Sequence, residues 1–148
     1  MSEESQRSEL LRQSHLSPSE LLIKGIAEFN AGAYFEQHET LETAWRNEPG
    51  PIRQLYQGIL QIGVAYYQIQ RRNYVGAMKM FQRATRYLDI LPDICQAVNI
   101  ARLRQDAAAA RAELERLGPE RIAIFNPVFF KPVQFVNERN ELRAHNVI

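Results

Sequence analysis

The stretch from Pro51 to about Arg71 leaves few choices of fold, because it is apolar over most of the circumference of a helix. Neighbours must cover such a helix on several sides, so we expect it to be the central helix of an all-α bundle. Its apolar face is centred on Leu55, Ile59, Ile62, Tyr66 and Ile69. Its polar stripe consists of Gln54, Gln57, Gln61 and Gln68.

Four further helices are predicted from capping and breaking residues. The capping box Ser17-Pro18-Ser19-Glu20, with proline at the first helical position, starts the first of them at Pro18. Glycine and proline end the helices, because glycine adopts the left-handed cap and proline cannot continue a helix. The predicted ranges are 18–30, 33–47, 74–91 and about 100–117, with a short turn around 93–96.

A weak internal repeat relates two of these helices. At an offset of 40 residues, Tyr34, Gln37, Leu41 and Ala44 align with Tyr74, Ala77, Phe81 and Ala84. The second pattern resembles the second helix of a tetratricopeptide-type hairpin, a TPR-like feature. Two units are too few for a solenoid. The sequence therefore predicts a compact bundle of about five helices, built from two antiparallel helical hairpins.

Composition divides the chain into three parts. Residues 1–16 are polar and charged, which predicts a flexible N-terminal arm, and residues 17–118 form the helical bundle domain. Residues 119–148 are rich in Ile, Val and Phe, but Pro127 and Pro132 forbid a regular helix, which predicts an extended apolar C-terminal tail. Exposed apolar surface drives association, so the tail should dock on its own bundle or on a partner subunit, in a homo-oligomer or with another protein.

Length and charge limit the classes of function. The 148 residues fit one domain, and a net charge of +1 argues against a nucleic-acid partner or an anionic membrane. Cys95 is the single cysteine, and residues 1–8 lack an apolar signal core, so we expect a cytoplasmic protein. No apolar run in the sequence approaches the ~20 residues that span a bilayer, which predicts no membrane association.

The stretch 29–45 interleaves titratable groups with aromatic residues at helical spacing. Helical geometry places His38 and Glu42 on the same face as Tyr34, Phe35, Leu41 and Trp45, and we expect this face to point toward the core. Buried ionisable groups cost several kcal/mol unless they are paired. The sequence thus predicts a buried polar cluster in which the glutamine stripe supplies hydrogen-bond partners.

The same stretch carries a family resemblance. The pattern Phe29-Asn30-x-Gly32-x-Tyr34-Phe35-Glu36-x-His38-Glu39-x-Leu41-Glu42-x-x-Trp45, followed by Tyr56-Gln57-Gly58-x-x-Gln61, resembles domain-of-unknown-function family 309. The resemblance covers roughly residues 21–92. It implies a small all-helical bundle and no established activity. It singles out as candidate ligand-binding residues Glu36, His38, Glu39, Glu42, Trp45, Gln57 and Gln61.

A metal-dependent hydrolase is the most specific chemistry for the HExxE motif His38-Glu39-x-x-Glu42. Residues i and i+4 of a helix can share a metal while a residue between them acts as base. The motif is incomplete, because the corresponding helix of zinc proteases has a second histidine where Glu42 stands. The other histidines, His15 and His145, lie in the terminal segments.

Two other roles for the cluster stay open. In an acid/base or small-ligand site, Glu42 lies beside Trp45 and shares a proton with His38, while Gln57 and Gln61 orient a polar ligand. In a structural role, Glu42 bonds to a glutamine or pairs with Arg46 at i+4, and His38 donates to a backbone carbonyl.

A third class of function is anion or nucleic-acid binding through the stripe Lys79, Arg83 and Arg86, near Arg71 and Arg72. Such a stripe is more often a solvated face, and the net charge does not favour this role. The sequence therefore favours a non-enzymatic interaction or structural module. The alternative is a small-ligand or metal site, with hydrolysis as its chemistry, formed by His38, Glu39, Glu42, Gln57 and Gln61. No catalytic residue, metal ligand or cofactor is assigned.

Overall fold

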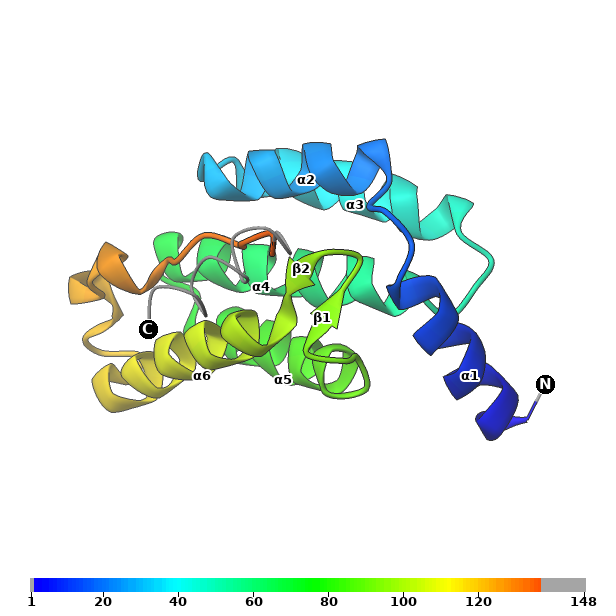
Figure 1. Ribbon diagram of the computed structural model, residues 1–148. Helices are drawn as coiled ribbons and strands as arrows, with labels where there is room; N and C mark the ends of the chain where they lie inside the picture. Colours follow the sequence, from blue (N-terminus) through cyan, green and yellow to red (C-terminus); the bar gives the residue numbers. More distant parts are fainter. Residues whose placement is uncertain (1, 137–148) are drawn as a thin grey trace, which may run out of the picture.

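A computed structural model of the protein describes residues 2–136 and contains six α-helices in this range (Figure 1). The helices are α1 (Glu3–Ser14), α2 (Glu20–Asn30), α3 (Tyr34–Asn47), α4 (Arg53–Gln70), α5 (Tyr74–Asp89) and α6 (Ile100–Leu117). The remaining elements are the strands β1 (Ile94–Cys95) and β2 (Val98–Asn99) and the 3-10 helices η1 (Ile122–Ile124) and η2 (Pro127–Phe129). The predicted all-α fold is confirmed.

Helix α4 occupies the centre of the bundle, as its apolar circumference predicts. It lies between α3 and α5, while α2 packs on α3 and α6 packs on α5 (Figure 1). Its residues Leu55, Ile59 and Tyr66 are fully buried. Gly58 allows α5 to approach closely, because a Cβ at this position would overlap the side chain of Leu88.

The helix ends follow the predicted signals with small shifts. Helix α2 begins at Glu20 rather than Pro18, because the capping side chain is Ser19, whose Oγ accepts a hydrogen bond from the Leu22 amide at 3.2 Å. Gly32 follows α2 with φ +78° and Gly118 follows α6 with φ +69°, conformations that glycine adopts without strain. No helix within residues 2–136 is long and apolar enough to cross a bilayer.

The N-terminal segment differs from the prediction. Residues 1–16 were expected to form a flexible arm, but Glu3–Ser14 is the helix α1, capped by Ser2. Its C-terminal half is attached to the bundle, because Leu10 and Gln13 are buried and the Gln13 Oε1 accepts a hydrogen bond from the Ile52 amide at 3.0 Å. A single long-range polar contact of this kind leaves no periodic signal in the sequence.

The segment between α5 and α6 is a small hairpin rather than the simple turn that was predicted. Gln96 and Ala97 adopt φ +47° and +64° between β1 and β2, the backbone signs of a tight two-residue hairpin. Arg104 of α6 ties the segment to α5: its guanidinium donates to the carbonyl oxygens of Leu88 and Leu91. The hairpin also holds α1, because the Gln96 amide donates to the Ser14 carbonyl at 2.7 Å.

The first part of the predicted C-terminal tail lies against its own bundle. Asn30 at the end of α2 makes two hydrogen bonds with the backbone of Val133, of 2.9 and 2.8 Å. The ring of Phe130 packs against that of Tyr66, with centroids 4.9 Å apart. The segment through Val136 contains η1 and η2 and is not uniformly extended. The rest of the predicted tail, residues 137–148, lies outside the described residues.

Candidate functional site

The face predicted to be buried on α3 is turned partly toward solvent. The buried residues of α3 are Tyr34, Gln37, Thr40, Leu41 and Ala44. The side chains of His38 and Glu42 are 39% and 29% exposed, and Phe35 is 55% exposed. The predicted burial of His38 and Glu42 is therefore wrong. The aromatic residues at 35 and 45 suggested an apolar face that is rotated from the one that packs on α2 and α4.

His38 and Glu42 form a polar pair along α3. The His38 Nε2 lies 3.1 Å from the Glu42 Oε2, and Arg46 pairs with the other oxygen of the same carboxylate. The structural role considered for this cluster predicted the pairing of Glu42 with Arg46 correctly. It also predicted that His38 donates to a backbone carbonyl, whereas His38 contacts Glu42. Glu36 and Glu39 are exposed on the same helix.

Trp45 joins this row of side chains to α4. The guanidinium carbon of Arg53 lies 4.1 Å from the centroid of the Trp45 ring, a cation–π contact, and Trp45 is half-buried against the core. From Arg53, the same side of α4 continues through Gln57 and Gln61 at steps of four residues. The Gln61 Nε2 donates to the Gln57 Oε1 at 3.1 Å. Among the described residues, no hydrogen bond joins these glutamines to His38 or Glu42.

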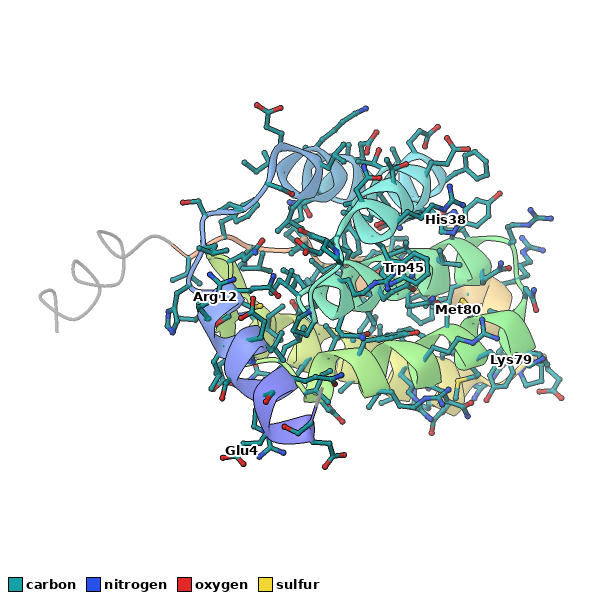
Figure 2. The ribbon with its side chains drawn as sticks, turned by 90° about the vertical axis from the view of Figure 1, so that its right-hand side faces the viewer. Glu4, Arg12, His38, Trp45, Lys79 and Met80 are labelled. Atoms are coloured by element: carbon teal, nitrogen blue, oxygen red, sulfur yellow. The ribbon has the colours of Figure 1, made fainter. Side chains whose placement is uncertain are left out.

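We call this surface the three-helix face. Figure 2 shows His38 and Trp45 on α3, with Met80 and Lys79 lying below them along α5. Val64 and Met80 are half-buried against the core, like Trp45. The three-helix face comprises His38, Glu42 and Trp45 of α3, Arg53, Gln57, Gln61 and Val64 of α4, and Met80 and Arg83 of α5. Five of the seven candidate residues thus lie on one surface. The exposed Glu39, next to His38 in the chain, lies at the edge of this surface, and Glu36 lies outside it.

Sequence reasoning missed three members of this face. Arg53 was not singled out, although the spacing Arg53, Gln57, Gln61 was a detectable signal for one helical stripe. Val64 and Met80 gave no signal of their own, because the sequence does not distinguish an apolar residue that is half-buried from one that is fully buried.

Metal binding has no complete ligand set within the described residues. Among residues 2–136, no three His, Cys, Asp or Glu side chains lie close enough together to hold a metal ion. His15 is exposed and far along the chain from α3, and His145 lies outside the described residues. His38 and Glu42 would therefore need a third ligand from elsewhere.

A surface pocket lies away from the candidate residues. It has a volume of about 540 Å³ between α1 and the turn before α4, with Glu9, Gln13, Glu48 and Arg53 in its wall. Of the described residues that line it, none is among the seven candidates. Arg53 contributes to both surfaces, since it lines the pocket and its guanidinium covers Trp45.

These features define a small all-α protein of two helical hairpins with a mixed polar and apolar face on three helices. Residues 22–80 match the model of the family described as Domain of unknown function (DUF309), which confirms the resemblance seen in the sequence. The chain is also similar to "Uncharacterized protein YpuF" of Bacillus subtilis (strain 168), with 38% identity over 68 residues. The aligned part is 45% of this chain and 39% of YpuF, so the chain spans well under half the length of that relative. Neither description assigns an activity.

Proposed function

We propose that the chain is a non-enzymatic protein-interaction module whose binding surface is the three-helix face. The observation that carries this proposal is the mixture of side chains on that surface. Trp45, Val64 and Met80 are half-buried on it, and the same surface carries charged and amide groups. Protein interfaces have the same anatomy, with aromatic residues and Met enriched at the core and a polar rim.

The polar groups of the face are already held in place, which favours binding. Glu42 contacts His38 and Arg46, Gln61 donates to Gln57, and Arg53 stacks on Trp45. Side chains that are ordered before association lose less conformational entropy when a partner binds. These contacts form within one helix or between neighbouring helices, so the surface keeps its shape without a ligand.

A second candidate function is a metal or small-ligand site formed by His38, Glu39, Glu42, Gln57 and Gln61. The observation that favours it is the 3.1 Å approach of the His38 Nε2 to the Glu42 Oε2, which places two ligand atoms side by side. Titration of the full chain with Zn²⁺, followed by calorimetry, tests this function. Binding that disappears in both His38→Ala and Glu42→Gln would support it, whereas binding that survives both substitutions would contradict it.

Site-specific photo-crosslinking tests the interaction module. A photoreactive residue replaces Gln57 on the three-helix face, and the control carries it at the exposed Gln105 of α6. We expect discrete protein adducts from position 57 that excess wild-type chain suppresses, and no such adducts from position 105. Equal labelling from both positions would contradict the proposal. So would a substrate turnover that disappears in Glu42→Gln while the fold stays intact.

A further inference from the structure

The two helical hairpins carry opposite charges. Residues 20–48, which contain α2 and α3, hold six acidic and two basic side chains, a net charge of −4. Residues 53–89, which contain α4 and α5, hold six basic and one acidic side chain, a net charge of +5. The overall charge of +1 conceals this separation. The molecule therefore has an acidic side and a basic side, with α4 between α3 and α5.

Many of these charges have no partner within the part of the chain that the structure describes. Glu36 and Glu39 of α3 are exposed and form no salt bridge there, and the same holds for the α5 side chains Lys79, Arg83 and Arg86. The charges of α6 behave differently. Arg111 pairs with Glu115, and Arg116 pairs with Glu113. Exposed charges of opposite sign without a salt bridge in the described part of the chain thus lie on the two helices that flank α4.

The arrangement suits a partner with the same charges in the opposite order. A two-fold axis that runs parallel to α4 and passes over its middle, near Gln61, exchanges the two flanks. The acidic α3 of each copy then lies over the basic α5 of the other, so the same contact forms twice. Such an isologous contact closes after two subunits and leaves no complementary surface free for further growth.

We propose that the partner on the three-helix face is a second copy of this chain, bound in an isologous dimer. This inference rests on the proposed function, because it names the partner of the same surface. In the dimer, Gln61 of α4 lies nearest the axis with Trp45 and Met80 on either side of it, and Glu39 at the edge of α3 faces Arg83 of the partner's α5. Complementary charges at the rim of an interface steer association and fix its register.

The size of the face is adequate for this role. The helices α3, α4 and α5 contain 14, 18 and 16 residues. At 1.5 Å per residue they are about 20 to 27 Å long, and three helices about 10 Å apart form a surface about 30 Å wide. The resulting area is of the same order as the ~800 Å² that each partner buries in a standard interface.

A polyanion is the competing occupant, since Arg71 and Arg72 continue the basic side of α5. Phosphate contacts would require the cations alone, and the acidic α3 on the other flank of α4 would repel the same backbone. A second copy uses both flanks of the face and therefore fits the observations better.

Charge exchange tests the dimer. Sedimentation equilibrium of the full chain gives the dimer dissociation constant at 50 mM and 500 mM salt. We expect a dimer at low salt that weakens at high salt, because the rim contacts are screened.

Reversing the charges tests the rim contacts. Glu39→Arg and Arg83→Glu should each raise the dimer dissociation constant by about tenfold, since each pair occurs twice. The double variant E39R/R83E should restore the constant to near wild type. Matched controls on other surfaces, Glu120→Arg and Lys24→Glu, should leave it unchanged.

The outcomes separate the inference from the proposed function. A chain that stays monomeric at 50 mM salt, or a double variant no better than the singles, overturns the dimer. If adducts from position 57 to other proteins persist in such a monomer, the interaction module stands and only its partner was misidentified. If a fluorescent oligodeoxythymidine binds the monomer and Arg83→Glu abolishes that binding while Glu39→Arg does not, the occupant is a polyanion and the dimer is overturned.

Discussion

Gln37 is a polar side chain that the bundle encloses completely. It has no exposed surface, and its Nε2 donates to the Leu60 carbonyl of α4 at 3.2 Å. The side-chain amide occupies the space beside Gly63, where a Cβ would overlap it. In the predicted repeat Gln37 aligned with Ala77, a position that packs an alanine against the same helix. The polar group that the core accommodates is therefore Gln37, not the His38 and Glu42 cluster.

The contact between Gln37 and Gly63 predicts non-additive stability. Gly63→Ala should lower the free energy of unfolding by about 2 kcal/mol, because its methyl group collides with the buried amide. In a Gln37→Ala background the same substitution should cost less than about 1 kcal/mol, since the space is then free. Urea titration of the four proteins measures the coupling. Equal costs of Gly63→Ala in both backgrounds would show that the two positions do not meet.

His38 and Glu42 should contribute little to stability. Both side chains are partly exposed, and even a fully charged pair in such a position is worth about 0 to 1 kcal/mol. We expect His38→Ala and Glu42→Gln each to change the free energy of unfolding by less than about 1 kcal/mol, with unchanged m-values. A loss of about 2 kcal/mol or more in either variant would mean that the pair is part of the structural core and would weaken its proposed role in binding.

The buried thiol of Cys95 should make the protein less stable at alkaline pH. Burial raises the pKa of its thiol from 9.0 to about 12, and burial also raises the pKa of the Tyr66 hydroxyl above its usual value. The unfolded chain therefore releases these protons first, so stability is complete below about pH 9 and falls as the pH rises through 12. Each group contributes a slope of about 1.4 kcal/mol per pH unit.

The substitution Cys95→Ala separates the thiol from the tyrosines. Between pH 9 and 10 the unfolding free energy of this variant should fall less steeply than that of the wild type, in urea titrations under reducing conditions. Native wild-type protein at pH 8 should also react slowly with a thiol reagent. Identical slopes, or rapid labelling of the native protein, would show that the thiol is accessible.

At the scale of elements, helix extents were predictable and helix orientations were only partly so. Caps and breakers act over a few residues: Asn30, Gly32 and Gly118 mark ends that the structure also shows. The direction of a face depends on where the neighbouring helices lie. Trp45 is wide enough to be half-buried while pointing toward the edge of the contact with α4, so counting it as a core residue rotated the predicted face of α3.

Helix α1 depends on a few hydrogen bonds for its attachment. Gln13 connects it to the start of α4 through the Ile52 amide, and the Gln96 side chain donates to the Gln13 carbonyl at 3.2 Å. Gln13→Ala should cost about 1 to 2 kcal/mol, because it leaves a buried amide without its acceptor. Hydrogen exchange should accelerate in α1 and at Ile52, while the middle of α4 keeps its protection.

A matched control lies on the same helix. Gln6 is exposed, so Gln6→Ala should leave the exchange pattern of α1 unchanged. Unaltered exchange in Gln13→Ala would show that apolar contacts such as those of Leu10 suffice to hold the helix.

At the scale of the whole molecule, the sequence predicted the bundle and most members of the face, but not how they combine. The pattern of residues 29–61 located His38, Glu42, Trp45, Gln57 and Gln61, and the structure places them on one surface. The separation of charge between the hairpins places opposite charges on the two sides of one face only because α4 lies between α3 and α5. The sequence does not show this order in space. Likewise, an apolar segment rich in phenylalanine predicts docking, but the contact of Val133 with Asn30 depends on the folded chain.

The C-terminal segment should unfold together with the bundle. Phe130 packs on Tyr66 and stacks on Phe125 with centroids 5.2 Å apart, so its ring belongs to the same aromatic cluster as Phe29 and Tyr34. Phe130→Ala should lower the free energy of unfolding by about 2 to 3 kcal/mol. Fluorescence of Trp45 reports the packing of α3 on α4, and circular dichroism at 222 nm reports all the helices. In urea both signals should shift together by the same amount, because the aromatic cluster links the segment to the central helix. If the substitution shifted neither transition, the segment after α6 would contribute nothing to the stability of the bundle.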